Sequence, residues 1–125
     1  MKACCLVCRD PEQAAQHPDW RQRDRAGKPC STLCLNGAYV AKVVWPWMTH
    51  AAADAACDSL EFDIPAAAGL PCWCDACTAH LKEANLDPND PAVRQQFALD
   101  SVARFQKETA AYAEAVRPGL KVIFT

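Results

Sequence analysis

The sequence predicts an α/β fold in which parallel strands alternate with helices. Three apolar segments, 3–8, 58–65 and 120–125, have the composition of strands, and the segments between them show helical periodicity. Strands that alternate with helices form parallel sheets through right-handed crossovers. Because only three strands can be assigned, we expect residues 1–125 to form one domain that is part of a larger α/β architecture.

The first expected strand, residues 3–8, is a short apolar run typical of a buried strand. A polar stretch, 9–29, follows it with three prolines, one glycine and many charges. We expect a long loop here, with one helical turn at 11–16. A loop of this length is unusual in a compact domain and is often functional.

The next segment, 36–57, is expected to be helical. One apolar side chain per turn would face the core. Pro46 removes a backbone donor, so it either kinks this helix or starts its second half. The predicted buried stripe is Tyr39, Val43, Trp47 and Ala51.

Within residues 58–65, apolar and acidic side chains alternate from Leu60 to Ile64, which predicts a strand that ends at Pro65. Its acidic face carries Glu61 and Asp63, roughly 6–7 Å apart along the strand. The opposite, apolar face is formed by Leu60, Phe62 and Ile64.

Two helices and a strand are expected in the C-terminal part. A short helix over 75–85 would have Asp75 as its N-cap. A longer helix would begin with Asp90 as N-cap and Pro91 at the first helical position, and would continue to an Arg-Pro-Gly stop. The final strand is 120–125.

Charge and hydropathy exclude several functional classes. The net charge is −2 and the pI about 5.9, so neither nucleic acid nor an anionic membrane is an expected partner. No apolar run approaches the roughly 18 residues of a membrane span, and the N-terminal apolar stretch is too short for a secretory signal. We therefore expect a cytoplasmic protein or one in an equivalent reducing compartment.

The nine cysteines are the most informative residues. In a reducing compartment, clustered cysteines indicate metal sites or catalytic thiols before they indicate disulfides. For Cys4, Cys5, Cys8 and Cys57 we expect the behaviour of small buried hydrophobes. The alternative for the first three is a second cluster that binds a soft metal.

Three cysteines, Cys72, Cys74 and Cys77, lie within six positions. The last two form a C-x-x-C pair at the start of a helix, which is compatible with a redox pair. A tetrahedral Zn²⁺ explains all three, provided that a fourth ligand comes from elsewhere. The candidates for the fourth ligand are Cys30, Cys34, Cys57 and His80.

Three segments resemble, in this order, the family 42 glycoside hydrolases, which are zinc-bearing β-galactosidases. They are LCLNGAYVAKVV (33–44), SLEFDIP (59–65) and CWCDAC (72–77). In that family the cysteine of the first segment joins the three of the last around zinc. The resemblance therefore implies a structural Zn²⁺ with four protein ligands: Cys34, Cys72, Cys74 and Cys77.

The sequences of HPDWRQRDRAGKP, CDSLEFDIP and the expected long C-terminal helix resemble another group more closely than they resemble family 42. This group is the uncharacterised glycosyl hydrolases with a (β/α)₈ barrel, which are distantly similar to family 29 α-L-fucosidases. This resemblance implies a partial TIM barrel, because a whole one takes about 250 residues. The second catalytic carboxylate of a family 42-like site would then lie on a missing strand. We expect either a truncated barrel or copies that associate as a homo-oligomer through exposed strand edges.

The resemblance also implies a hydrolase acting on a small carbohydrate, with Asp63 as strand-end catalytic carboxylate. Its position matches the acid/base of the β-galactosidases and the nucleophile of the fucosidases. Glycosidases use two carboxylates; Glu61 is a second candidate, or a residue tied to a basic partner. His17 and Trp20 in the long loop are expected to bind the sugar, with loop packing as the alternative.

Three functions thus remain open from the sequence. The first is a glycosidase-like hydrolase with structural zinc, since four thiolates leave no coordination position for water. The second is a non-catalytic, zinc-stabilised α/β scaffold that self-associates. The third is a metal-handling or thiol-redox protein that uses the cysteines near the N-terminus.

Overall fold

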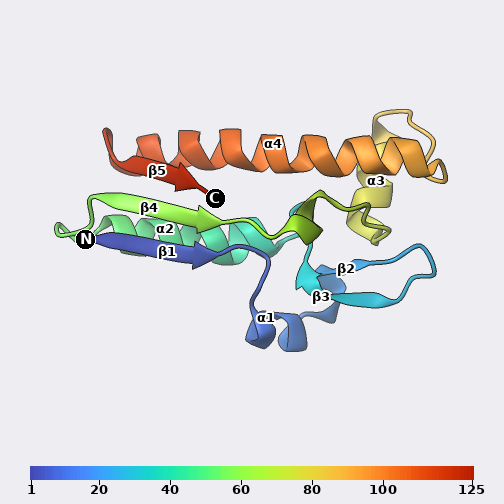
Figure 1. The fold of residues 1–125 in the computed structure, drawn as a ribbon, viewed down its shortest axis with the longest axis horizontal. Coiled ribbons are helices and arrows are strands. Elements are labelled where there is room, and N and C mark those ends of the chain that lie inside the picture. The colour runs from blue at the N-terminus through green and yellow to red at the C-terminus, as the bar shows by residue number, and fades with distance from the viewer.

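The computed structural model describes residues 1–125 as a parallel three-stranded sheet with helices packed on it and a separate antiparallel hairpin (Figure 1). In chain order the elements are β1 (Lys2–Leu6), α1 (Pro11–Gln16), the 3₁₀-helix η1 (Pro18–Trp20), β2 (Arg21–Arg23), β3 (Pro29–Leu33), the π-helix η2 (Val40–Val44), α2 (Trp45–Ala52), β4 (Ser59–Asp63), the 3₁₀-helix η3 (Ala66–Gly69), α3 (Asp75–Glu83), α4 (Pro91–Val116) and β5 (Lys121–Phe124).

The sheet has the order β1-β4-β5, and both pairs of neighbouring strands are parallel. Cys4 lies opposite Glu61, and Leu60 lies opposite Val122. The helices α2 and α4 lie in the connections between the strands, as right-handed crossover units require. The predicted parallel α/β fold and its three strands are therefore confirmed.

Helices cover only one face of this sheet. The ring of Phe62, which is fully buried, contacts Trp47 of the α2 helix at 5.8 Å and Phe105 of α4 at 6.3 Å between centroids. Side chains on the opposite face remain open, and Leu6 is 57% exposed. The expectation that the first strand is buried therefore holds for one face only: Ala3 and Cys5 pack against the core, whereas nothing in this chain covers the face of Leu6.

The buried stripe of η2 and α2 is displaced by one residue from the prediction. The N–H of Trp45 bonds to the carbonyl of Val40, which closes a π-helical turn immediately before Pro46. A π turn contains one extra residue, so the core-facing positions after Tyr39 move forward by one. After Tyr39, the buried residues of this segment are Val40, Val44, Met48 and Ala52. The helix also begins later and ends earlier than the predicted span of 36–57.

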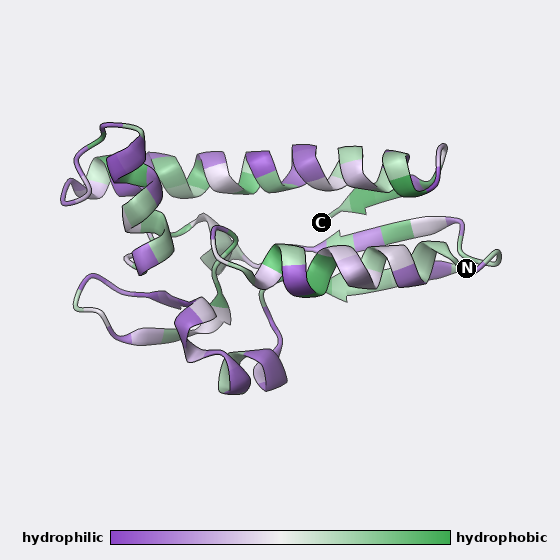
Figure 2. Cartoon of the chain, turned by 180° about the vertical axis from the view of Figure 1, so that it is seen from behind, coloured by the Kyte–Doolittle hydropathy of each residue, from purple (hydrophilic) through white to green (hydrophobic).

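The polar segment 9–29 contains more structure than predicted. The helical turn at 11–16 is present as α1, with Asp10 accepting a hydrogen bond from the Gln13 N–H at 3.1 Å. The expected loop also contains β2, which pairs antiparallel with β3. Figure 2 shows that β2 is mostly hydrophilic, so it lacks the apolar alternation by which strands are recognised in a sequence.

Each of the two C-terminal helices begins at a residue whose side chain caps it. Asp90 caps α4 by accepting from the Ala92 N–H at 2.9 Å, and Pro91 occupies the first helical position, as predicted. For α3 the predicted N-cap, Asp75, is wrong: the capping residue is Cys74, whose sulfur accepts from the Cys77 N–H at 3.5 Å. No helix is both long and apolar enough to cross a membrane.

Candidate metal centre and sheet-end carboxylates

Four cysteine side chains converge at the end of the molecule where the hairpin, α3 and the start of α4 meet. Cys34 follows β3, Cys72 and Cys74 lie in the loop before α3, and Cys77 is in the first turn of that helix. Their sulfur atoms all lie within 4.8 Å of one another, and all four residues are buried. The Cys34 sulfur is 3.5 Å from that of Cys77 and 3.6 Å from that of Cys74.

These distances fit a metal ion. With zinc–sulfur bonds of about 2.3 Å, tetrahedral geometry places the sulfur atoms about 3.8 Å apart. Four thiolates are also a soft donor set, which favours zinc over magnesium or calcium. The other candidate ligands lie outside the group: Cys57 donates to the Ser59 carbonyl at 3.4 Å, and exposed His80 lies 6.1 Å from the ring of Phe97.

The pKa values of the four thiols depend on one another. Hydrogen bonds with Cys34, Cys72 and Cys77 hold the pKa of the Cys74 thiol below its ordinary range. Hydrogen bonds with the other three thiols, together with burial, raise the pKa of Cys34. To bind a metal ion the four thiols would have to lose their protons, and the positive charge of the ion would stabilise the resulting thiolates.

Asn36 connects the cysteine group to α4. Its backbone N–H donates to the sulfur of Cys34 at 3.3 Å, and its side-chain amide donates to the sulfur of Cys77 at 3.6 Å. The same amide nitrogen lies 2.9 Å from the hydroxyl of Ser101. N–H donors to thiolate sulfur orient the ligands and stabilise their charge.

Arg94 anchors the cysteine loop and was not found from the sequence. Its guanidinium, on α4, donates to the carbonyls of Cys72 at 2.9 Å and Pro88 at 2.7 Å and to the hydroxyl of Thr78 at 2.8 Å. It also lies over the ring of Trp73, 4.4 Å from the centroid. Arg94 is 3% exposed. An arginine on a helix is usually solvated, so no sequence signal pointed to this burial.

The two predicted carboxylates lie on the open face of the sheet, and each has a basic partner. The Glu61 carboxylate is 2.7 Å from the ammonium of Lys2, and Asp63 is 2.9 Å from the guanidinium of Arg9. Asp63 ends β4 at the carboxyl edge of the parallel strands, where ligands of α/β sheets bind. The chain continues from Asp63 through η3 into the cysteine loop.

His17 and Trp20 stack on each other, with ring centroids 3.7 Å apart. Trp20 is 7% exposed and belongs to the hydrophobic core, and its carbonyl accepts a hydrogen bond from the Cys34 N–H at 2.8 Å. The burial of the indole favours the loop-packing alternative for Trp20. His17 is half-buried and keeps one part of its surface open.

The three cysteines near the N-terminus, Cys4, Cys5 and Cys8, do not form a second metal cluster. Cys4 is exposed on the open face of the sheet, whereas Cys5 is half-buried against the core on the other face. Burial raises the pKa of the Cys8 thiol to about 12 and that of Cys5 to about 11. The group formed by Cys34 and its three partners is the one place where three or more metal-ligating side chains meet.

Comparison with known proteins gives a structural neighbour but no family. No family model matches this chain, and no curated protein matches it. Among solved structures, α-L-fucosidase isoenzyme 2 from Paenibacillus thiaminolyticus superposes with a TM-score of 0.83 over 98% of this chain, at 23% sequence identity. The chain shares its fold with part of a fucosidase. It spans 20% of the length of that enzyme.

Proposed function

We propose that this chain is a zinc-stabilised α/β unit of a glycoside hydrolase, in which Asp63 is a catalytic carboxylate and Zn²⁺ is structural. One observation carries the proposal: the loop that leaves Asp63 leads directly into a buried group of four cysteine sulfurs. The fold shared with part of an α-L-fucosidase supports a carbohydrate as the substrate class.

The proposed zinc would act through the fold and not through the reaction. Four thiolates from Cys34, Cys72, Cys74 and Cys77 complete a tetrahedral shell and leave no position for water. The site would join the end of β3, the loop after Asp63 and the first turn of α3. Because such a site does not exist in the unfolded chain, the free energy of metal binding becomes folding free energy.

The geometry of Asp63 suits a nucleophile or an electrostatic stabiliser. Its ion pair with Arg9 restrains the position of the carboxylate. Glycoside hydrolysis requires a second carboxylate. It lies about 5–5.5 Å from the first in enzymes that retain the anomeric configuration, and further away in enzymes that invert it. Glu61 is the proposed second group, and its ion pair with Lys2 is equally consistent with a supporting role. His17 is the proposed contact to substrate hydroxyls.

Metal content and turnover test the two parts separately. Elemental analysis should find about one zinc per chain, and chelation should unfold the protein. Cys34→Ser should abolish stoichiometric zinc, whereas Cys30→Ser, outside the group, should retain it. A stable, zinc-free chain with native secondary structure would contradict the structural role of the metal.

For catalysis, the zinc-loaded protein should hydrolyse an aryl glycoside from a panel that includes aryl α-L-fucoside. Asp63→Asn should lower kcat/KM at least about a hundredfold, because an amide can neither attack nor carry the required charge. Asp100→Asn, an exposed position on α4, is the matched control. Unchanged turnover in Asp63→Asn would remove Asp63 from the mechanism.

A second candidate function is a non-catalytic zinc scaffold that self-associates. The uncovered face of the sheet favours it, because Leu6 and Cys4 are exposed there and β1 and β5 both have free edges. In that case the native mass would be a multiple of the chain mass and no aryl glycoside would be hydrolysed. The metal-handling alternative instead requires more than one metal per chain.

A further inference from the structure

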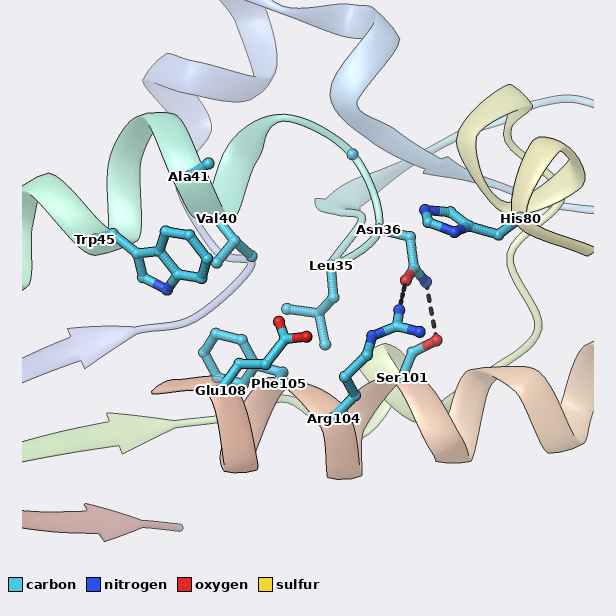
Figure 3. A pocket seen from close by; sticks show the side chains of 11 residues that line it. Leu35, Asn36, Val40, Ala41, Trp45, His80, Ser101, Arg104, Phe105 and Glu108 are labelled. Atoms are coloured by element: carbon cyan, nitrogen blue, oxygen red, sulfur yellow. Dashed lines mark hydrogen bonds between the residues drawn. The ribbon is translucent and has the colours of Figure 1, made fainter. Parts of the chain in front are cut away.

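We propose that the hollow between the η2–α2 segment and α4 binds a small dipolar ion: a molecule with a carboxylate, an ammonium group and a compact apolar body, such as an apolar α-amino acid. The residues that line this hollow come from the loop before η2, from η2, α2, α3 and α4 (Figure 3), and Asp63 is not among them. Its volume of about 320 Å³ is at the lower end of the range for small-molecule sites.

Two opposite charges face the hollow without neutralising each other. Arg104 and Glu108 are one turn apart on α4, and Figure 3 shows both side chains directed toward the segment that carries Leu35 and Asn36. Residues at this spacing commonly pair. These two form no ion pair, since the chain's three salt bridges all lie elsewhere. One positive and one negative group therefore remain available to a ligand.

The guanidinium of Arg104 is held in place by the metal-centre residues. It donates to the side-chain carbonyl of Asn36, whose N–H groups are directed at the sulfurs of Cys34 and Cys77. It also lies over the ring of Phe97, 5.8 Å from the centroid. A charged group that is fixed before binding loses less conformational entropy on binding.

Among the other polar side chains of the hollow, which are Asn36, His80 and Ser101, two have no hydrogen-bonding group left for a ligand. Asn36 and Ser101 are already satisfied, because Asn36 bonds Arg104 and the sulfurs while the Ser101 hydroxyl donates to the Phe97 carbonyl at 2.6 Å. Arg104 can offer two parallel N–H donors to a carboxylate, and Glu108 accepts only from donors. A dipolar ion satisfies both with charge-assisted hydrogen bonds, which are about twice as strong as neutral ones.

Apart from His80 and the unpartnered N–H of Trp45, the rest of the lining is apolar and would receive the body of the ligand. Leu35, Val40, Trp45 and Phe105 form this wall (Figure 3). The space beside Gly37 is open, since a Cβ added there would meet no atom within 4 Å. Burial of an aliphatic side chain against this wall would distinguish a large apolar amino acid from glycine.

The test is calorimetric titration of the zinc-loaded chain with L-leucine. We expect saturable binding that weakens at least tenfold for leucinamide, which lacks the carboxylate, for N-acetyl-leucine, which lacks the ammonium group, and for glycine, which lacks the apolar body. L-Fucose, a neutral sugar, should not compete. The proposal would be overturned if leucinamide bound as tightly as L-leucine, or if L-fucose displaced L-leucine. It would also be overturned if the titration with L-leucine gave no saturable heat.

Variants locate the binding to this hollow. Glu108 is exposed and makes no side-chain hydrogen bond, so Glu108→Gln should fold normally and weaken L-leucine binding at least tenfold. Glu83→Gln makes the same chemical change at an exposed position outside the hollow and should leave the Kd unchanged. Equal Kd values for the two variants would place the ligand elsewhere and overturn the proposal.

Discussion

The guanidinium of Arg94 donates a 2.9 Å hydrogen bond to the backbone carbonyl of Cys72, and both groups are buried. Arg94 belongs to α4, which follows the cysteine loop in the chain and supplies none of the four cysteines, so this bond fastens the loop to a further helix. The cysteine ligands are thereby held on two sides, by Arg94 from α4 and by Asn36 from the segment before η2.

Arg94→Met should destabilise the zinc-loaded protein by about 2–4 kcal/mol, because it leaves the carbonyls of Cys72 and Pro88 without a donor in a buried site. Urea unfolding measures this change. Arg25→Met is the control, since Arg25 is exposed and touches the cysteine loop only through the ring of Trp73. An Arg94 variant as stable as the control would show that the zinc site needs no such anchor.

The π turn before Pro46 predicts a difference between two adjacent valines. Val44 is fully buried, whereas Val43 is half-buried. Val44→Ala should cost about 2 kcal/mol of unfolding free energy through lost burial and a small cavity, and Val43→Ala about half of that or less. Denaturant titration of both variants checks the register. A larger loss of stability for Val43→Ala than for Val44→Ala would contradict the π turn and support the buried positions that the sequence predicts.

Alkaline pH should weaken the fold through the thiols of Cys5 and Cys8. Burial raises the pKa of Cys8 from 9.0 to about 12 and that of Cys5 to about 11, so the folded protein favours the neutral thiols. This contribution is fully present below pH 9, where the unfolded thiols are also protonated, and is lost as the pH rises from 9 to about 12. The midpoint of urea unfolding should therefore be lower at pH 10.5 than at pH 8.

Alkylation tests the same pKa values residue by residue. Iodoacetamide reacts with thiolates, so at pH 8 Cys4, which is exposed, should be labelled long before Cys5 or Cys8, as peptide mass spectrometry can follow. The Cys8→Ala variant should show a smaller loss of stability between the two pH values. Labelling of Cys8 in the native protein at the rate of Cys4 would contradict the burial of its thiol.

Several elements were determined by the local sequence alone. The alternation of Leu60 and Phe62 with Glu61 and Asp63 predicted β4, its buried face and its acidic face correctly. The Asp90-Pro91 pair predicted the start of α4 to the residue. These features depend on side-chain period, capping chemistry and proline geometry, which act over a few neighbouring residues and are therefore legible without the rest of the fold.

Only the tertiary structure decided which distant groups meet. The spacing of Cys72, Cys74 and Cys77 left four candidates for the fourth metal ligand, and the choice of Cys34 came from a resemblance. In the folded chain the sulfur of Cys34 lies with the other three, and the remaining candidates, Cys30, Cys57 and His80, lie outside the group. The burial of Arg94, the hairpin strand β2 and the shift caused by the π turn likewise have no local signal. Each depends on surfaces far apart in sequence, whose contact sets the free energy of the arrangement.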